Sequence, residues 1–203
     1  MSAGLLEPLP IEVDSIPRER QFRYTLEKYH RMIAAGAFDP EERCELIDGS
    51  LVKSMPQSSG HSHSVGRSAR WFNRRLDDPW VVGSQTPITL APHEPEPDCW
   101  ISRSDRRPAR GQHPGPAEVA LVVEVAESSL AFDRGRKRRL YAAAGIPEYW
   151  IVNLADRQVE VHRRPIPAEN RYAEVETVSA DGSVKVVLDG SEFGSLPLSE
   201  LLP

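Results

Sequence analysis

The sequence predicts an α/β fold with a mixed β-sheet core flanked by helices. The unit from Val119 to Leu154 has the pattern of a buried strand, a helix ended by Gly145 and a second strand. Such a unit implies parallel neighbours joined by a right-handed crossover. The strand-like segments before and after it are joined by turns, which favours antiparallel pairing and adds further strands at the C-terminal side.

Length and composition are those of an ordinary folded domain. The chain has 203 residues, of which 39% are hydrophobic and 27% charged, as in soluble globular proteins. No apolar run approaches about 18 residues and no signal-peptide pattern opens the chain, so we expect a cytoplasmic protein without a membrane partner. Cys44 and Cys99 lack CxxC spacing, which fits a reducing compartment.

The net charge of -5 does not point to nucleic-acid binding. A local basic patch could still bind nucleic acid on a protein with this net charge.

We divide the chain into a loose, Pro-rich arm over residues 1–20 and a single domain over residues 21–203. The domain is expected to begin with a helix ended by Gly36. This helix carries one apolar stripe at helical spacing, formed by Phe22, Leu26, Tyr29 and Ile33.

Further elements follow along the chain. "CELIDGSLVKSMP" is typical of a hairpin around Asp48-Gly49, with Glu45 on its first strand. "WVVGSQTPITL" and "PDCWIS" are strand-like, with a Pro-rich turn between them. After the central unit, "RQVEVHR", "YAEVETV" and "SVKVVLDG" are also expected to be strands.

A second helix is predicted over "HSHSVGRSARWFNRRL". Its apolar arc contains Val65, Ala69, Phe72 and Leu76. His61 falls near this arc and is expected to face the body of the protein. Arg67, Arg70 and Arg74 lie on the opposite face, either as a solvated helix back or as a stripe that faces phosphates.

Glu124 is the most informative residue, because it interrupts the Leu- and Val-rich strand "LVVEV", where an uncompensated charge is costly. Asp98 follows Pro97 at the start of the preceding strand, so neighbouring strands can bring the two carboxylates together. Two anions that close repel each other unless a cation lies between them. A hard ion such as Mg²⁺ suits this pair, because it often binds one or two carboxylates plus waters and phosphate oxygens.

Lys137 strengthens this interpretation. At about 100° per residue it lies about 40° from Asp133, on the helix stripe that faces the sheet. A buried ammonium needs a carboxylate or phosphate partner. A purely structural ion pair with Asp133 or Glu124 is the competing explanation.

In this order and spacing, the motifs "YHRMIAAG", "ERCELIDGSLV", "EPEPD", "LVVEVAESSLAFDRGRK" and "LYAAAGIPEYWIVNL" are specific. Together they resemble the PD-(D/E)XK nuclease superfamily, and within it the bacterial restriction-endonuclease-like family of Uma type. The resemblance implies a restriction-endonuclease-like sheet with additional C-terminal strands. The usual lysine position of the superfamily, two residues after the acidic residue, is Ala126 here. Relatives look as though they supply that lysine from the next helix, which corresponds to Lys137.

The resemblance also implies roles for individual residues. Asp98 and Glu124 would bind Mg²⁺, or Mn²⁺ in its place, with the backbone carbonyl of Val125 as a further ligand. Lys137 would orient the attacking water and stabilise charge on the phosphate.

Two further positions match less specific features of the family. Glu45 matches an acidic position beside the first metal, with a hairpin surface charge as the alternative. His61 matches a histidine that contacts the scissile phosphate or a ligand carboxylate, with a core histidine as the alternative.

The predicted function is that of a metal-dependent endonuclease acting on nucleic acid, with DNA as the expected substrate and a homodimer as the expected assembly. The alternative is a nuclease fold with an idle site that serves as a DNA-binding or protein-interaction module. The chain has no GxSxG, GxxxxGK or HExxH motif. A glycosidase that uses Asp98 and Glu124 is disfavoured because only 7% of residues are aromatic.

Overall fold

The computed structural model of the protein describes residues 17, 20–39, 42–54, 57–106 and 111–203. The predicted arm over residues 1–20 therefore lies outside the described residues, apart from residues 17 and 20. The division into an arm and one domain stays a prediction.

The core of the fold is a six-stranded sheet in the order β3-β4-β5-β6-β7-β8. Its strands are β3 (Trp80–Gly83), β4 (Cys99–Arg103), β5 (Val119–Ala126), β6 (Glu148–Asn153), β7 (Gln158–Ile166) and β8 (Arg171–Ser179). β5 and β6 run parallel, whereas every other neighbouring pair is antiparallel. The predicted mixed α/β architecture is confirmed.

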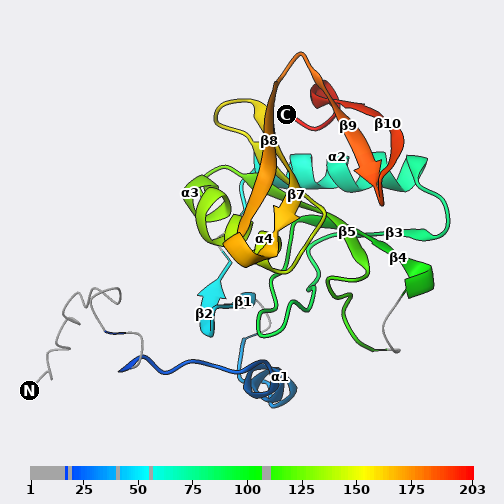
Figure 1. The fold of residues 1–203 in the computed structure, drawn as a ribbon. Helices are drawn as coiled ribbons and strands as arrows, with labels where there is room; N and C mark the ends of the chain where they lie inside the picture. Colours follow the sequence, from blue (N-terminus) through cyan, green and yellow to red (C-terminus); the bar gives the residue numbers. More distant parts are fainter. Residues whose placement is uncertain (1–16, 18–19, 40–41, 55–56, 107–110) are drawn as a thin grey trace, which may run out of the picture.

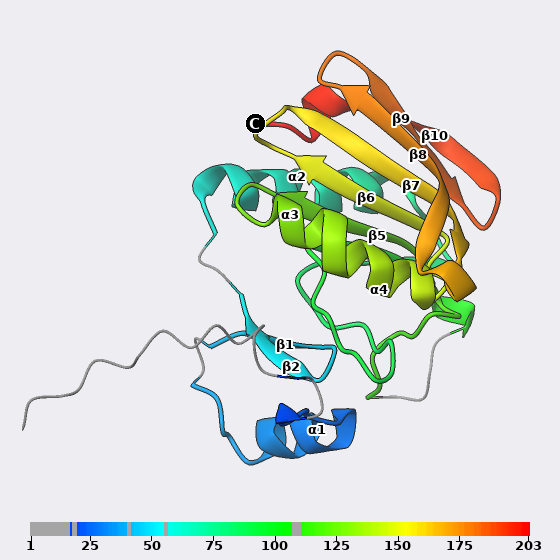
Figure 2. The same cartoon turned by 60° about the vertical axis from the view of Figure 1, so that its left-hand side comes forward.

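Helices cover both faces of this sheet (Figure 2). One face packs on α2 (Ser59–Arg75), and the other packs on a continuous helical segment. That segment consists of α3 (Leu130–Phe132), the π-helical turn η4 (Asp133–Lys137) and α4 (Arg138–Ala143). Side chains of β5 alternate between the two cores, with Val123 and Val125 toward α2 and Val122 and Ala126 toward α4.

Smaller elements surround the sheet (Figure 1). They are α1 (Leu26–Ala34), the hairpins β1 (Cys44–Ile47) with β2 (Ser50–Lys53) and β9 (Ser183–Leu188) with β10 (Ser191–Pro197), and the short 3-10 turns η3 (Ser104–Arg106), η5 (Pro167–Glu169) and η6 (Leu198–Glu200). The predicted turn at Asp48-Gly49 is present, and both of its residues have positive φ angles of 56° and 72°. Such angles suit the tight hairpin turn that this dipeptide favours.

The first hairpin is fastened to the segment that precedes β4. Leu46 and Glu94 exchange backbone hydrogen bonds of 3.2 and 2.8 Å, and the Asp48 N–H donates to Nδ1 of His93 at 2.9 Å. Ile88 lies in this segment and is fully buried, although it belongs to a loop. The predicted strand "WVVGSQTPITL" is therefore strand only over Trp80–Gly83, and the rest is a loop.

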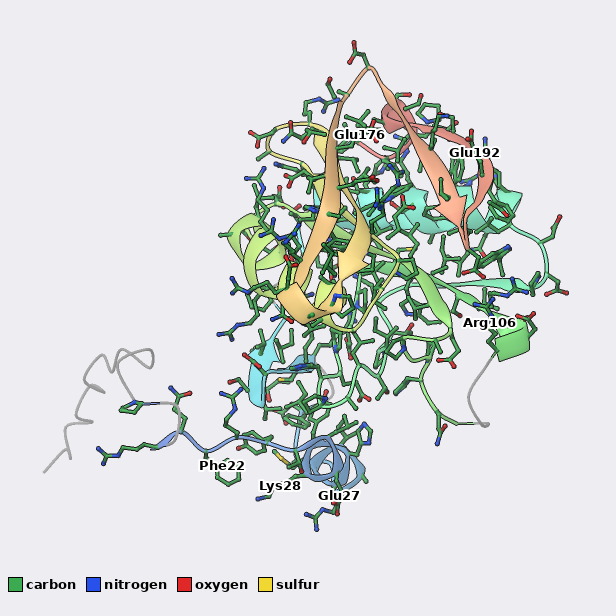
Figure 3. The ribbon with its side chains drawn as sticks, viewed as in Figure 1. Phe22, Glu27, Lys28, Arg106, Glu176 and Glu192 are labelled. Atoms are coloured by element: carbon green, nitrogen blue, oxygen red, sulfur yellow. The ribbon has the colours of Figure 1, made fainter. Side chains whose placement is uncertain are left out.

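The apolar stripe predicted for the first helix is mostly not buried. Tyr29 is 5% exposed, but Phe22 is 65% and Ile33 49% exposed. Figure 3 shows Phe22 and Lys28 at the outer edge of the molecule. The helix packs beside the β1 region rather than on the main sheet, and the Tyr29 hydroxyl donates to the Cys44 carbonyl at 2.5 Å. The predicted helix is shorter than expected, because α1 begins at Leu26 and leaves Phe22 outside it, and Tyr29 is the buried member of the predicted stripe.

The structure differs from the sequence analysis at two other places. The strand β10 was not predicted, because its sequence "SEFGSLP" offers few apolar positions and its register is irregular between Glu192 and Ser195. Arg67 is not free on the helix back, because its guanidinium donates to the carbonyls of Ser199 and Leu202 at 2.8 and 3.3 Å.

Phe72 tests how far stability depends on the contact between α2 and the sheet. Its ring is fully buried and lies against Trp71 and Trp150, with centroid distances of 5.3 and 5.9 Å. We expect Phe72→Ala to lower the free energy of unfolding by about 3–5 kcal/mol in urea denaturation, because it leaves a cavity. Val175→Ala is the control, since Val175 is 56% exposed, and it should cost below about 1 kcal/mol. Equal losses would contradict this account of the core.

Candidate active site

A cavity of about 300 Å³ lies at the end of β5, beside the residue that precedes β4. The residues singled out from the sequence all line it: Glu45, His61, Asp98, Glu124, Val125 and Lys137. The cavity wall is acidic, because six carboxylates face three lysine or arginine side chains. The carboxylates belong to Glu45, Glu96, Asp98, Glu124, Glu127 and Asp133, and the cations to Arg43, Lys53 and Lys137.

The register of the sheet brings Asp98 and Glu124 together. Cys99 pairs with Val123 across the antiparallel β4–β5 ladder, so one further step places Asp98 opposite Glu124. Both residues are buried, at 8% and 3% exposure. Like charges directly opposite each other destabilise a sheet, so this pair needs compensation by cations or hydrogen-bond donors.

Glu124 receives two donors from the helical segment on its face of the sheet. Lys137 Nζ lies 2.9 Å from its Oε1, and the Tyr141 hydroxyl donates to the same oxygen at 2.6 Å. Burial raises the pKa of Glu124 and the Asp98 carboxylate adds to the rise, whereas the Lys137 ammonium opposes it. Burial acts to lower the pKa of Lys137, but Glu124 and Glu45 outweigh it and raise that pKa. Lys137 therefore stays charged at neutral pH.

Glu45 reaches the same ammonium from the docked hairpin. Its Oε1 lies 3.1 Å from Lys137 Nζ and accepts a hydrogen bond from the Glu96 N–H at 3.2 Å. With 6% exposure, Glu45 is not the hairpin surface charge that the sequence left open. One lysine thus bridges two carboxylates that lie far apart in the sequence.

Asp98 is held from α2 and from β5. Its Oδ2 accepts the Val125 N–H at 2.9 Å and lies 3.1 Å from His61 Nε2. Burial lowers the pKa of His61, but the Asp98 carboxylate and the Val125 backbone outweigh it, so the pKa is raised. Among the described residues, Oδ1 accepts a hydrogen bond only from the Gln85 amide, at 3.4 Å. The N–H and C=O of a strand residue point to the same side, so the Val125 carbonyl faces the Asp98 side as well.

Lys137 is inward-facing and buried, as its helical position predicts, although the turn that carries it is π-helical. π-helical turns are often found at functional sites. Within the described residues it pairs with Glu124 and Glu45 but not with Asp133. Asp133 instead accepts a hydrogen bond from Ser129 Oγ at 2.6 Å. Burial raises its pKa to about 6, with Lys137 opposing the rise.

Three contributors to the site were missed in the sequence. Tyr141 follows Lys137 by one helical turn, and this i,i+4 spacing was the available signal. Gln85 lies in a loop, where no periodicity marks it. Arg43 forms an ion pair with Glu96 at 2.6 Å, which orders the segment that supports Glu45.

Several oxygen atoms of the site are free to bind a hard divalent cation. Oε2 of Glu124 and Oε2 of Glu45 accept no hydrogen bond from the described part of the chain, and Asp98 Oδ1 accepts only a long one. Over the described ranges, no three His, Cys, Asp or Glu side chains converge as a metal-binding group. Two carboxylates with open oxygens and one carbonyl nevertheless fit Mg²⁺, which usually keeps several waters.

The fold and this carboxylate–lysine site define a restriction-endonuclease-like α/β protein. The chain belongs to the Uma2 family, described as "Putative restriction endonuclease", whose model matches residues 26–197. This family membership supports a nuclease.

The fold also resembles a solved structure. This is the crystal structure of a putative nuclease belonging to DUF820 from Anabaena variabilis ATCC 29413, with 18% identity and a TM-score of 0.65. The match covers 87% of this chain and 96% of that chain, and at this identity it supports the fold alone. No curated protein matches the sequence. Among the described helices, none is both long and apolar enough to span a membrane.

Asp133 provides a test of the electrostatics of the cavity wall. Its native pKa of about 6 lies above the unfolded value, so the protonated form stabilises the fold at low pH, and this contribution is lost as pH rises through about 6. We expect Asp133→Asn to gain about 2–3 kcal/mol over the wild type between pH 4 and pH 8, because a shift of two pKa units is worth about that much. Urea denaturation at both pH values measures it.

Asp105→Asn is the control for this measurement. Asp105 is exposed, and its ion pair with Arg103 lowers the pKa of its carboxyl. No gain at pH 8 is expected there. An Asp133→Asn protein whose advantage is the same at both pH values would contradict the raised pKa.

Proposed function

We propose that the protein is a metal-dependent endonuclease that hydrolyses phosphodiester bonds of nucleic acid, with DNA as the substrate. The observation that carries the proposal is the pair of buried carboxylates, Asp98 and Glu124, that face one cavity beside a buried lysine. Phosphodiesters hydrolyse very slowly unaided, so a catalyst must both activate water and stabilise charge on the phosphate. Membership of the Uma2 family supports this reaction class.

Mg²⁺, or Mn²⁺ in its place, would be held by Asp98, Glu124 and the carbonyl of Val125, with Glu45 beside it. A bound divalent cation generates hydroxide near neutral pH and stabilises negative charge on the phosphate. The acidic cavity wall supports the proposal, since it carries six carboxylates but only three lysine or arginine side chains, an excess that a bound cation would offset.

The side chains of this protein have their own roles in the proposal. Lys137 orients the attacking water and places a positive charge near the phosphate, because its ammonium is held at the cavity wall by two carboxylates. Tyr141 keeps Glu124 Oε1 in place, and Oε2 accepts no hydrogen bond from the described residues. His61 orients Asp98 through its contact of 3.1 Å and can present a proton near the phosphate.

A module with an idle site is the second candidate, because Lys137 already neutralises Glu124 and Glu45 without a metal. Metal binding distinguishes the two candidates. For the endonuclease, a homodimer is the assembly we propose, since two symmetric sites can cut both strands of a duplex.

Removal of the carboxylates tests the metal site. We expect Mg²⁺ to raise the melting temperature of the wild type, because an ion at 100 times its Kd stabilises by about 2.7 kcal/mol. Asp98→Asn and Glu124→Gln should each lose this shift and lose cleavage of plasmid DNA. Glu127→Gln is the matched control, because Glu127 lines the cavity and contacts neither proposed ligand side chain by a hydrogen bond. Wild-type cleavage by either site variant would refute the assignment, whereas a wild type that Mg²⁺ does not stabilise would favour the idle module.

Lys137→Met tests the role of the ammonium. The substitution keeps most of the apolar stem, so at saturating Mg²⁺ the thermal shift should persist while the cleavage rate falls about 10²–10³-fold through loss of positioned charge. Lys53→Met is the control, because Lys53 also lines the cavity but pairs with Glu42 at 2.9 Å. A Lys137→Met protein that cleaves at the wild-type rate would show that this lysine serves only as an ion-pair partner.

A further inference from the structure

The charge of α2 differs from that of the rest of the surface. Its 17 residues include no Asp or Glu, but they include four arginines at positions 67, 70, 74 and 75. Elsewhere, many basic side chains have a carboxylate within ion-pair distance. Examples are Lys53–Glu42, Arg103–Asp105, Arg106–Asp189, Arg134–Glu160, Arg163–Glu148, Arg164–Glu174 and Arg171–Glu169. Within the described residues, no arginine of α2 has such a partner.

Three of the four arginines of α2 form one stripe. At about 100° per residue, Arg67, Arg70 and Arg74 fall within an arc of about 60°. Val65 and Phe72, two of the five buried residues of the helix, lie on the opposite side. The stripe therefore faces outward along the helix.

Not every member of the stripe is available to a ligand. Arg67 is engaged by the carbonyls of Ser199 and Leu202. Arg75 lies off the stripe, with its guanidinium 4.3 Å from the centre of the Trp71 ring. Arg70 and Arg74 are exposed, and no described residue forms a hydrogen bond or ion pair with either. These two guanidinium groups are the free positive charges of the helix.

The helix that carries the stripe begins at the cavity. Ser58 caps the first turn of α2, and both it and His61 line the cavity wall. With a rise of about 1.5 Å per residue, Arg70 lies about 14 Å and Arg74 about 20 Å along the axis from His61. These distances correspond to about four and six nucleotides at about 3.4 Å per nucleotide of a duplex strand.

We propose that Arg70 and Arg74 on the outward face of α2 bind the phosphate backbone of duplex nucleic acid about four to six base pairs from the bond in the cavity. This inference rests on the function proposed above. Guanidinium groups match phosphate oxygens with two parallel hydrogen bonds, and they stay charged at all relevant pH values. Phosphate contacts position a duplex without reading its sequence, so this surface supplies affinity and alignment rather than specificity.

The occupant is a nucleic acid rather than an acidic protein because of where α2 begins. A nucleic acid bound at the cavity extends beyond it on both sides. One path for it runs along α2, where Arg70 and Arg74 provide positive charge without a carboxylate partner among the described residues. The remaining cavity wall is acidic and repels a polyanion, so anchoring contacts must come from outside the cavity.

The test is binding of a fluorescent duplex of about 30 base pairs, measured by anisotropy in EDTA over a series of salt concentrations. We expect Arg70→Gln/Arg74→Gln to weaken binding about tenfold, whatever the base sequence, and to reduce the slope of log K against log salt by about 1.8, since each phosphate contact contributes about 0.9. A duplex of about six base pairs reaches only about 10 Å to either side of its centre, so its affinity should not change. Melting curves check that both proteins are folded.

The control is Arg164→Gln/Arg171→Gln, which removes the same charge from exposed arginines that pair with Glu174 and Glu169. It should bind the long duplex like the wild type. Equal loss in both double variants would reduce the effect to net charge and overturn the proposal. Unchanged binding by Arg70→Gln/Arg74→Gln, with good binding by the wild type, would overturn it while the endonuclease stands. If the wild type binds no duplex even at about 10⁻⁴ M, the proposed function itself fails, and this inference fails with it.

Discussion

The bridge formed by the Lys137 ammonium is the interaction on which the site depends. Glu124 lies in a central strand, and an isolated carboxylate there would cost several kcal/mol. Lys137 lies 2.9 Å from it and 3.1 Å from Glu45, with only 8% of its own side chain exposed. Such a buried group is tolerated only when its partners are well placed, and removal of one partner is costly. Tyr141 adds a hydrogen bond from an uncharged donor, which supports Glu124 without adding further charge.

This bridge also connects parts of the fold that are distant in sequence. Glu45 comes from the small β1–β2 hairpin, and Lys137 from the helical segment that packs on the main sheet, 92 residues later. The hairpin is held in this position by the pairing of β1 with Glu94 in the loop before β4, and by the hydrogen bond from the Asp48 N–H to His93. The same loop ends at Asp98. A peripheral hairpin, a loop and a core helix therefore assemble one wall, so the geometry of the site reflects the docking of the hairpin as much as the sheet.

The features that could be predicted from the sequence were those that stand out in a local pattern of apolar and polar residues. Glu124 stands out in an apolar run, and Lys137 stands out on an inward helix stripe, so both burial states followed from the sequence. A pattern does not reveal what covers an apolar face, and the predicted stripe of the first helix leaves Phe22 and Ile33 exposed. Tyr141 has an apolar body, so its inward position looked like ordinary packing although its hydroxyl bonds Glu124. β10 combines few apolar residues with an irregular register, and its pairing is decided by the β9 partner rather than by its own sequence.

The net charge of -5 conceals a separation of charge over the molecule. Carboxylates gather at the cavity, where a polyanionic substrate would be repelled, and arginines without carboxylate partners gather on α2, the helix that begins at that cavity. A cation-binding centre needs the first property, whereas a phosphate backbone needs the second. An acidic protein can satisfy both only if the two kinds of charge are kept on different elements. Here the strand ends and the docked hairpin carry the carboxylates, while a helix without a single acidic residue carries the free guanidinium groups. Overall composition is therefore a poor guide to what this surface attracts, because the field near α2 is set by its own unpaired charges within about 10 Å.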